Sequence, residues 1–113
     1  SVIWLVANMV KVKCQILQIY IMKSNSLRKY SLECLGTIFF LYVILLTGQA
    51  WAIGLALALM IYIVGPVTGG HFNPAVSIMM YAKKQISMND TLLYILAQVL
   101  GGLIALGLYK MLS

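Results

Sequence analysis

The sequence predicts an all-α membrane protein with three transmembrane helices and one re-entrant half-helix. Of its 113 residues, 63% are apolar and 9% are charged, whereas about 25% of the residues of a soluble domain are charged. No charged side chain occurs from Cys34 to Ala82. Within that stretch lies the polar run 68–77, Thr-Gly-Gly-His-Phe-Asn-Pro-Ala-Val-Ser. Irregular backbone survives at membrane depth only where it is buried in protein or lines a wet cavity, so this run predicts a cavity.

Residues 1–29 are predicted to form a separate N-terminal segment. If residues 1–23 are helical, one stripe carries the polar side chains Asn8, Lys11, Gln15 and Gln18. Such a stripe favours an interfacial helix over a span. A signal peptide fits less well, because the basic residues follow the most apolar stretch. Because the chain starts with Ser, a truncated extension or spurious upstream translation is an alternative origin for this segment. Residues 23–29 then form a basic connector.

Three apolar runs account for the spans, at about 30–47, 51–67 and 91–112, and each is long enough to cross a bilayer. A small, polar turn, Thr-Gly-Gln-Ala at 47–50, separates the first two. Either Asn89 or Asp90 is expected to cap the third helix.

The half-helix follows from residues 68–81. Asn73 is a favoured N-cap residue, and Pro74 suits the first helical position. A helix from Pro74 to about residue 81 is roughly 12 Å long, less than half of the ~30 Å apolar slab. Its N-terminus would bring N–H donors and a positive partial charge to mid-membrane, which disfavours cations and orients neutral dipoles. Gly69 and Gly70 are expected to provide an extended backbone with a row of carbonyl acceptors.

The basic residues predict an orientation. The net charge is +6, but these residues flank apolar runs instead of following one face, which favours a topology signal over nucleic-acid binding. One side of the predicted bilayer carries Lys23, Arg28, Lys29, Lys83 and Lys84, and the other carries Lys110. By the positive-inside rule, the N-terminus and the half-helix entrance are cytoplasmic.

Three motifs, in order, resemble the aquaporin or major intrinsic protein family. Residues 70–76, Gly-His-Phe-Asn-Pro-Ala-Val, are similar to the family's first Asn-Pro-Ala box. Glu33 with Thr37 resembles the Glu-x-x-x-Thr of its first span, and residues 94–101, Tyr-Ile-Leu-Ala-Gln-Val-Leu-Gly, resemble its third. The resemblance covers about residue 30 to the C-terminus. It implies half of an inverted-repeat fold in the lipid bilayer, a channel for water or small neutral solutes such as glycerol, and a homo-oligomer, a tetramer, for the full-length protein.

The resemblance also implies roles for single residues. The pore would be lined by Gly69, Gly70, His71, Asn73, Pro74 and Ala75, with the Asn73 amide donating to a solute at mid-membrane. Glu33 and Gln98 would brace the loop, and Ile53 falls where the family places a residue of its outer constriction. The residues alone leave plainer alternatives open: Asn73 as a helix cap only, His71 as a buried hydrogen-bonded ring, Glu33 as a solvated acid, and Ile53 as a lipid-facing or core side chain.

One repeat is present, without a second Asn-Pro-Ala box or the Arg after it. We therefore expect a fragment of a longer channel, completed by the missing second repeat or another channel subunit. A natural half that pairs with an oppositely inserted partner is the competing explanation. A non-conducting truncated subunit that packs with full-length channels is the alternative function. An ion-coupled transporter is disfavoured, because the only acidic residues are Glu33 and Asp90.

The remaining motifs predict packing and not chemistry. Small residues recur every four positions on two spans and let helices approach closely; they are Ala97, Gly101 and Ala105 on the third, and Gly54 and Ala58 on the second. Cys14 and Cys34 lack the spacing of a disulfide framework or a zinc site. No nucleophile and base pair or phosphate loop is present in the sequence, so neither an enzyme nor a cofactor or metal is expected.

Overall fold

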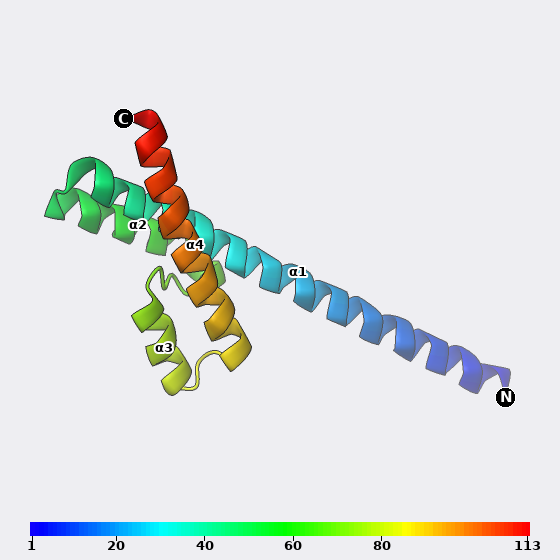
Figure 1. Ribbon diagram of the computed structural model, residues 1–113. Coiled ribbons are helices and arrows are strands. Elements are labelled where there is room, and N and C mark those ends of the chain that lie inside the picture. Colours follow the sequence, from blue (N-terminus) through cyan, green and yellow to red (C-terminus); the bar gives the residue numbers. More distant parts are fainter.

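The computed structural model describes the backbone of residues 1–113 and the side chains of residues 1–20 and 25–113. Over these residues the order of elements is α1 (Val2–Thr47), α2 (Ala50–Thr68), α3 (Pro74–Ala82) and α4 (Met88–Leu112) (Figure 1). Three of them, α1, α2 and α4, are long and apolar enough to cross a membrane. The predicted fold class is confirmed: this is an all-α membrane protein with three long helices and one short re-entrant helix.

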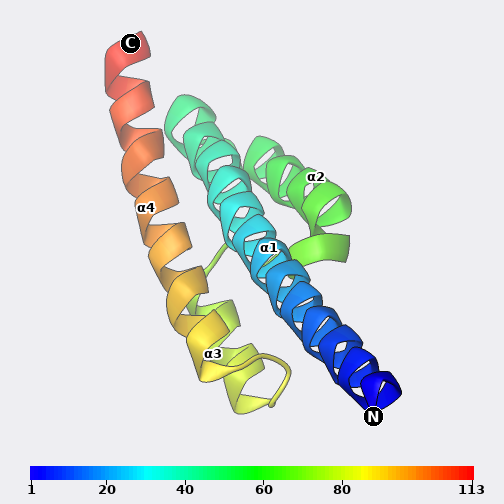
Figure 2. The ribbon, with the colours of Figure 1, turned by 90° about the vertical axis from the view of Figure 1, so that its right-hand side faces the viewer.

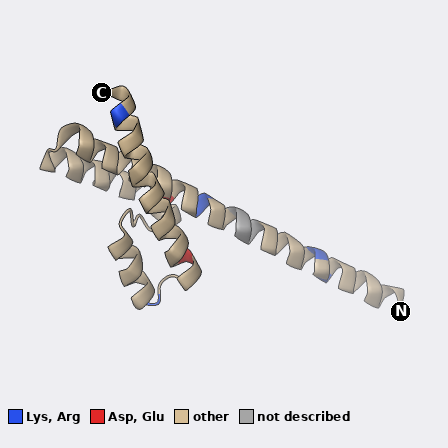
Figure 3. Ribbon diagram, viewed as in Figure 1, with Lys and Arg blue, Asp and Glu red and all other residues tan. Residues whose placement is uncertain are grey.

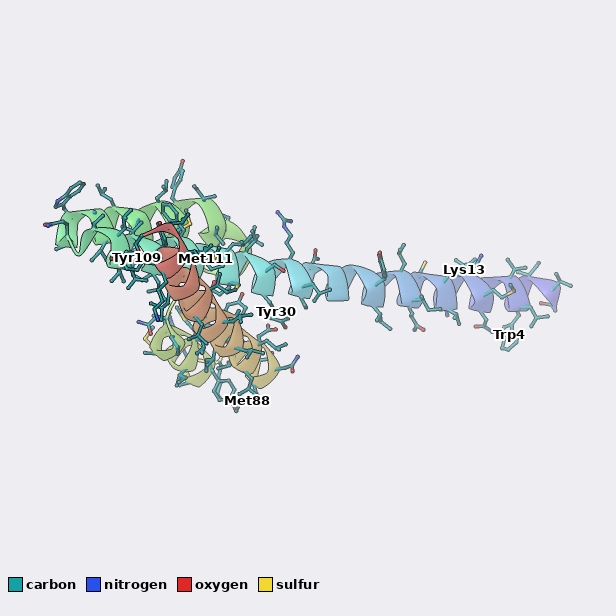
Figure 4. The ribbon with its side chains drawn as sticks, turned by 45° about the horizontal axis from the view of Figure 1, so that its top comes forward. Trp4, Lys13, Tyr30, Met88, Tyr109 and Met111 are labelled. Atoms are coloured by element: carbon teal, nitrogen blue, oxygen red, sulfur yellow. The ribbon has the colours of Figure 1, made fainter. Side chains whose placement is uncertain are left out.

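α1 is longer than a single crossing requires. Its 46 residues span about 69 Å at 1.5 Å per residue, more than twice the ~30 Å hydrocarbon thickness. Its N-terminal half projects away from the other helices (Figure 1), and side chains there, Trp4 and Lys13 among them, point into open space (Figure 4). Residues 23–29 were predicted to be a connector, but the helix is not interrupted there. Residues 25–29 are helical, because they include neither Gly nor Pro. The side chains of Lys23 and Ser24 lie outside the described residues.

α1 occupies the centre of the structure. It packs against α4 and against α2, while α3 packs against α4, and the view in Figure 2 shows α1 standing between α4 and α2. The seam between α1 and α4 uses the predicted small residues, because Ala97, Gly101 and Ala105 are all buried. A Cβ atom added at Gly101 would lie 3.0 Å from the Cys34 carbonyl oxygen, so the two backbones approach closely there.

The small residues of α2 have a different environment. A Cβ atom at Gly54 would have nothing within 4 Å, and Ala58 is exposed. The close packing predicted for this face is therefore not made within the described chain. α2 ends where Gly69 adopts a left-handed conformation, φ 90°, and its N–H donates to the Gly65 carbonyl at 2.8 Å.

α3 is the predicted half-helix. It begins at Pro74 and has nine residues, about 13 Å at 1.5 Å per residue, which is too short to cross a bilayer. The N-cap is Asn73, whose Oδ1 accepts a hydrogen bond from the Ala75 N–H at 2.9 Å. The chain then turns through Lys84, φ 66°, and runs back in the opposite direction as α4 (Figure 1).

The N-cap of α4 differs from the prediction. Ser87 takes that position, because its side chain accepts a hydrogen bond from the Asp90 N–H at 3.0 Å. The helix therefore begins at Met88, three residues before the predicted start, and Asn89 and Asp90 lie in its first turn. The carboxylate of Asp90 instead accepts a hydrogen bond from the Tyr30 hydroxyl at 2.6 Å, which joins the start of α4 to α1.

Candidate functional site

The loop between α2 and α3 is a tight reversal. Gly69 and Gly70 have φ values of 90° and 65°, so the predicted extended backbone at these two residues is wrong. Only glycine enters the left-handed region at little cost, and here Gly69 closes α2 while Gly70 passes close to the helix it has just left. A Cβ at Gly70 would lie 3.3 Å from the Ile61 Cα atom. The two glycines therefore allow the chain to fold back on α2.

Phe72 is held at a positive φ of 52°, an uncommon conformation for a bulky residue. Its backbone N–H donates to Glu33 Oε1. Its ring is buried against Gly36, where a Cβ atom would overlap the ring. α1 therefore holds both the backbone and the side chain of Phe72, and these two contacts offset the conformational cost.

A buried polar network joins the loop, α1, α3 and α4. Glu33 is completely buried, and Gln98 is almost so. The Gln98 Nε2 atom lies 3.1 Å from Glu33 Oε1 and 2.9 Å from Ser77 Oγ. Ser77 Oγ in turn lies 2.9 Å from His71 Nδ1. Because polar side chains in an apolar interior are stable only when paired, these bonds fix the loop and α3 against α1 and α4.

Tyr94 supports the same loop from α4. Its hydroxyl donates to the Thr68 carbonyl at 2.8 Å, which satisfies one of the carbonyls left unpaired at the end of α2. Its ring meets the His71 ring edge to face, with centroids 5.0 Å apart and planes at 65°. Thr68 Oγ1 accepts a hydrogen bond from the Gly70 N–H at 2.9 Å. The loop is therefore held on its inner side at successive residues.

The outer side of the loop is open. Asn73 and Gly69 are exposed, whereas Gly70, His71 and Phe72 are buried. Beside Asn73 lies a cavity of about 410 Å³, and its lining includes Thr37, Phe72, Pro74, Gln98, Gly102 and Leu103. Residues 98–103 lie at the middle of α4 (Met88–Leu112). The N-terminal end of α3 therefore lies level with the midpoint of a membrane-spanning helix.

The structure brings most of the predicted site residues together. Within or beside this loop lie Gly69, Gly70, His71, Asn73, Pro74, Ala75, Glu33 and Gln98. It does not bring Ile53 to them: that side chain is half-buried in the first turn of α2. Ile53 precedes Thr68 by 15 residues, about 22 Å along a helix.

Sequence reasoning missed four contributors, namely Ser77, Thr68, Tyr94 and the ring of Phe72. A spacing signal existed for two of them. Ser77 follows Asn73 by four residues and Tyr94 precedes Gln98 by four, so each shares a helix face with a predicted site residue. Among the residues whose side chains are described, no group of three His, Cys, Asp or Glu residues is placed to hold a metal ion.

Comparisons with known proteins place this chain among relatives of known family. The family profile described as Major intrinsic protein matches residues 20–113. The Glycerol uptake facilitator protein-like 6 of Lactiplantibacillus plantarum is 40% identical over 88 residues, which cover 70% of this chain and 41% of that protein. The probable aquaporin PIP2-7 of Oryza sativa subsp. japonica is 30% identical over 116 residues, covering 80% and 40%. The probable aquaporin PIP2-4 of Arabidopsis thaliana is 32% identical over 115 residues, covering 76% and 40%.

The chain therefore spans about two fifths of the length of these curated relatives. The family profile, by contrast, covers all of α2, α3 and α4 and most of α1. As its three motifs predicted, the chain belongs to the major intrinsic protein family.

Proposed function

We propose that this chain supplies the first half of a membrane channel for passive permeation of water and small uncharged solutes such as glycerol. One observation carries the proposal. The Oδ1 atom of Asn73 is occupied as the cap of α3, which leaves the two Nδ2 hydrogens as donors. The side chain is exposed beside the mid-span cavity. A neutral molecule with an oxygen lone pair fits such a donor, and the positive end of the α3 dipole disfavours a cation at the same place.

The proposal gives the two sides of the loop different roles. On the open side, the carbonyls of Gly69, Gly70 and His71 would accept hydrogen bonds from permeating molecules, with Pro74 and Ala75 completing the wall. On the inner side, Glu33 and Gln98 would brace the loop, which is supported by their burial and by their bonds to Phe72 and Ser77. For Ile53 we propose a place in the outer constriction, far from Asn73 along α2.

A closed pore requires protein on the open side of Asn73. We propose that a second repeat, whether from a longer form of this chain or from another channel subunit, covers that side. In such inverted-repeat folds the half-helix termini meet at the bilayer midplane, the depth supported here by the position of Asn73 beside the middle of α4. The complete channel would be a homo-oligomer, a tetramer, in the lipid bilayer.

For orientation, we propose that the N-terminus is cytoplasmic. Figure 3 shows the basic residues on α1 and at the turn between α3 and α4, with a further one near the C-terminus at the other end of α4. Lys83 and Lys84 are exposed at that turn, and Lys110 is exposed near the C-terminus. An excess of Lys and Arg marks the cytoplasmic side of a membrane protein.

Osmotic shrinkage of liposomes tests the channel proposal. We expect liposomes that contain the chain alone to shrink no faster than protein-free liposomes, because the pore wall is half built. A chimaera that joins the chain to the C-terminal part of the Lactiplantibacillus plantarum relative should raise water or glycerol permeability. Asn73→Ala should abolish that gain in the chimaera. Fast shrinkage with the chain alone would contradict the need for a second half, and a chimaera that inserts without conducting would contradict the channel.

The face of α2 that carries Gly54 and Ala58 supports the alternative, a non-conducting subunit that packs with full-length channels. It is a small-residue surface of the kind that membrane helices use for association, and within the described chain it is left uncovered. Co-purification with a full-length relative, without any transport by the chimaera, would favour this alternative.

A further inference from the structure

The hydrogen bonds around Glu33 run in one direction. The backbone N–H of Phe72 can only donate, so Glu33 Oε1 is an acceptor. The amide atom of Gln98 that approaches the same Oε1 at 3.1 Å must therefore be its nitrogen and not its oxygen. That nitrogen also approaches Ser77 Oγ at 2.9 Å. It follows that Ser77 accepts a hydrogen bond from Gln98.

Ser77 must then pass its own proton to His71. A hydroxyl carries one proton, and within the described part of the chain Ser77 Oγ has two partners, Gln98 Nε2 and His71 Nδ1. The Gln98 nitrogen is a donor only, so the Ser77 proton lies on the 2.9 Å path to His71 Nδ1. Nδ1 is therefore the acceptor, and a neutral His71 carries its own proton on Nε2. A proton on Nδ1 would leave the Ser77 hydroxyl without its acceptor.

The Nε2 atom lies on the side of the ring that faces Gly69. A Cβ atom built at Gly69 would lie 3.1 Å from it, and Gly69 is exposed on the open side of the loop. Among the described side chains, the buried polar atoms without a partner are Glu33 Oε2 and Gln98 Oε1. His71 Nε2 is not one of them, and among the described side chains the hydrogen bond of this ring is made through Nδ1. The Nε2 atom is therefore not completely covered by the chain, although the His71 side chain as a whole is only 7% exposed.

We propose that His71 Nε2–H is a second hydrogen-bond donor to permeating molecules, and that the Gln98–Ser77 relay holds the ring in this tautomer. The proposal rests on the channel function proposed above. The donor suits an oxygen lone pair of water or of an alcohol hydroxyl, and it lies beside the carbonyl acceptors of the loop. Ser77 is a positioning residue that acts through His71, and the edge-to-face contact with Tyr94 holds the plane of the ring.

The chain offers a direct spectroscopic test, because His71 is its one histidine. The full chain labelled with ¹⁵N-histidine, in lipid nanodiscs, gives separate nitrogen signals for Nδ1 and Nε2. We expect a proton on Nε2 alone, magnetisation exchange between that proton and water, and a shift of the Nε2 signal on addition of glycerol. A proton on Nδ1, or on both nitrogens, would overturn the proposal. So would an Nε2–H signal without exchange with water.

Two substitutions test the relay itself. Ser77→Ala removes the hydroxyl that donates to Nδ1 and should cause loss of the single-tautomer signature. Ser77→Thr retains a hydroxyl and should preserve it. Ser31→Ala, at an exposed position on α1, is the matched control and should change nothing. An unchanged tautomer in Ser77→Ala would overturn the relay; if that variant does not fold, the wild-type spectrum still decides.

The readout does not depend on transport, so the two proposals fail separately. A conducting chimaera whose His71 carries its proton on Nδ1 would overturn this inference and leave the channel proposal standing. A water-accessible Nε2–H group in a chimaera that does not conduct would instead contradict the channel.

Discussion

The inner and outer sides of the re-entrant loop differ in how completely they are built. On the inner side, Phe72 and Ser77 are buried and hydrogen-bonded to α1 and α4, and Ser77 also holds Nδ1 of the buried His71 ring. On the outer side, Gly69 and Asn73 are exposed beside a cavity. A loop at membrane depth must satisfy its polar groups inside protein. This chain does so on one side only, so the inner contacts of the loop form without any protein on its outer side.

The same contrast separates two helices. On α4, the small residues Gly101 and Ala105 are buried against α1, whereas on α2 Gly54 and Ala58 face outward. Both helices carry the same four-residue spacing. The burial of the small residues therefore depends on whether a neighbouring helix packs on that face, and not on their spacing.

The largest loss of stability is expected from a substitution that removes the contacts on the inner side of the loop. Glu33→Ala removes the acceptor of two buried donors, the Phe72 N–H and one Gln98 N–H. Each donor left unpaired costs about 1–3 kcal/mol, so unfolding in detergent should require clearly less denaturant. Glu33→Gln keeps an oxygen acceptor of the same shape and should lose much less. Equal stability of Glu33→Ala and wild type would show that the network does not hold the loop.

The next prediction compares the small-residue face of α4 with that of α2. In Gly101→Ala the added Cβ atom meets the Cys34 carbonyl at 3.0 Å, and overpacking of a close contact costs about 1–3 kcal/mol. Gly54→Ala, the matched control, adds its Cβ to open space and should gain about 0.5–1 kcal/mol from helix propensity. The unfolding free energies of the two variants in detergent check the difference. Equal losses in both would contradict the assignment of a packed face and an open face.

The smallest expected effect on stability lies on the outer side. Asn73→Ala removes the side chain that accepts the Ala75 N–H and should cost about 1 kcal/mol. Asn73→Ser retains a capping oxygen, so it should recover most of that loss while lacking the amide donors. Thermal unfolding followed by circular dichroism measures both variants. A loss for Asn73→Ala as large as that for Glu33→Ala would mean that the outer side also carries the fold.

Features set by near neighbours in the chain were predictable. The start of α3 follows from Asn73 and Pro74 alone, because a cap and a proline act within one helical turn. The end of α1 likewise follows from Gly48, whose φ is 59°. The connector at 23–29 was predicted wrongly, since a run of basic and polar residues need not interrupt a helix.

Other features depended on distant residues. Phe72 takes its positive φ against Glu33 from 39 residues away, and Gln98 meets Glu33 across 65 residues. The direction of the hydrogen bonds that selects the His71 tautomer needs three elements at once. Neither hydropathy nor local propensity carries such information.

By itself, the sequence determined the three apolar helices, the short capped helix between the second and third, and the family, because hydropathy, capping and motif spacing act over a few turns of the chain. Only the tertiary structure decided which side of the loop is braced and which is open. That outcome depends on where α1 and α4 cross the loop, and hydrogen bonds and close contacts between them act only across a few ångströms of space.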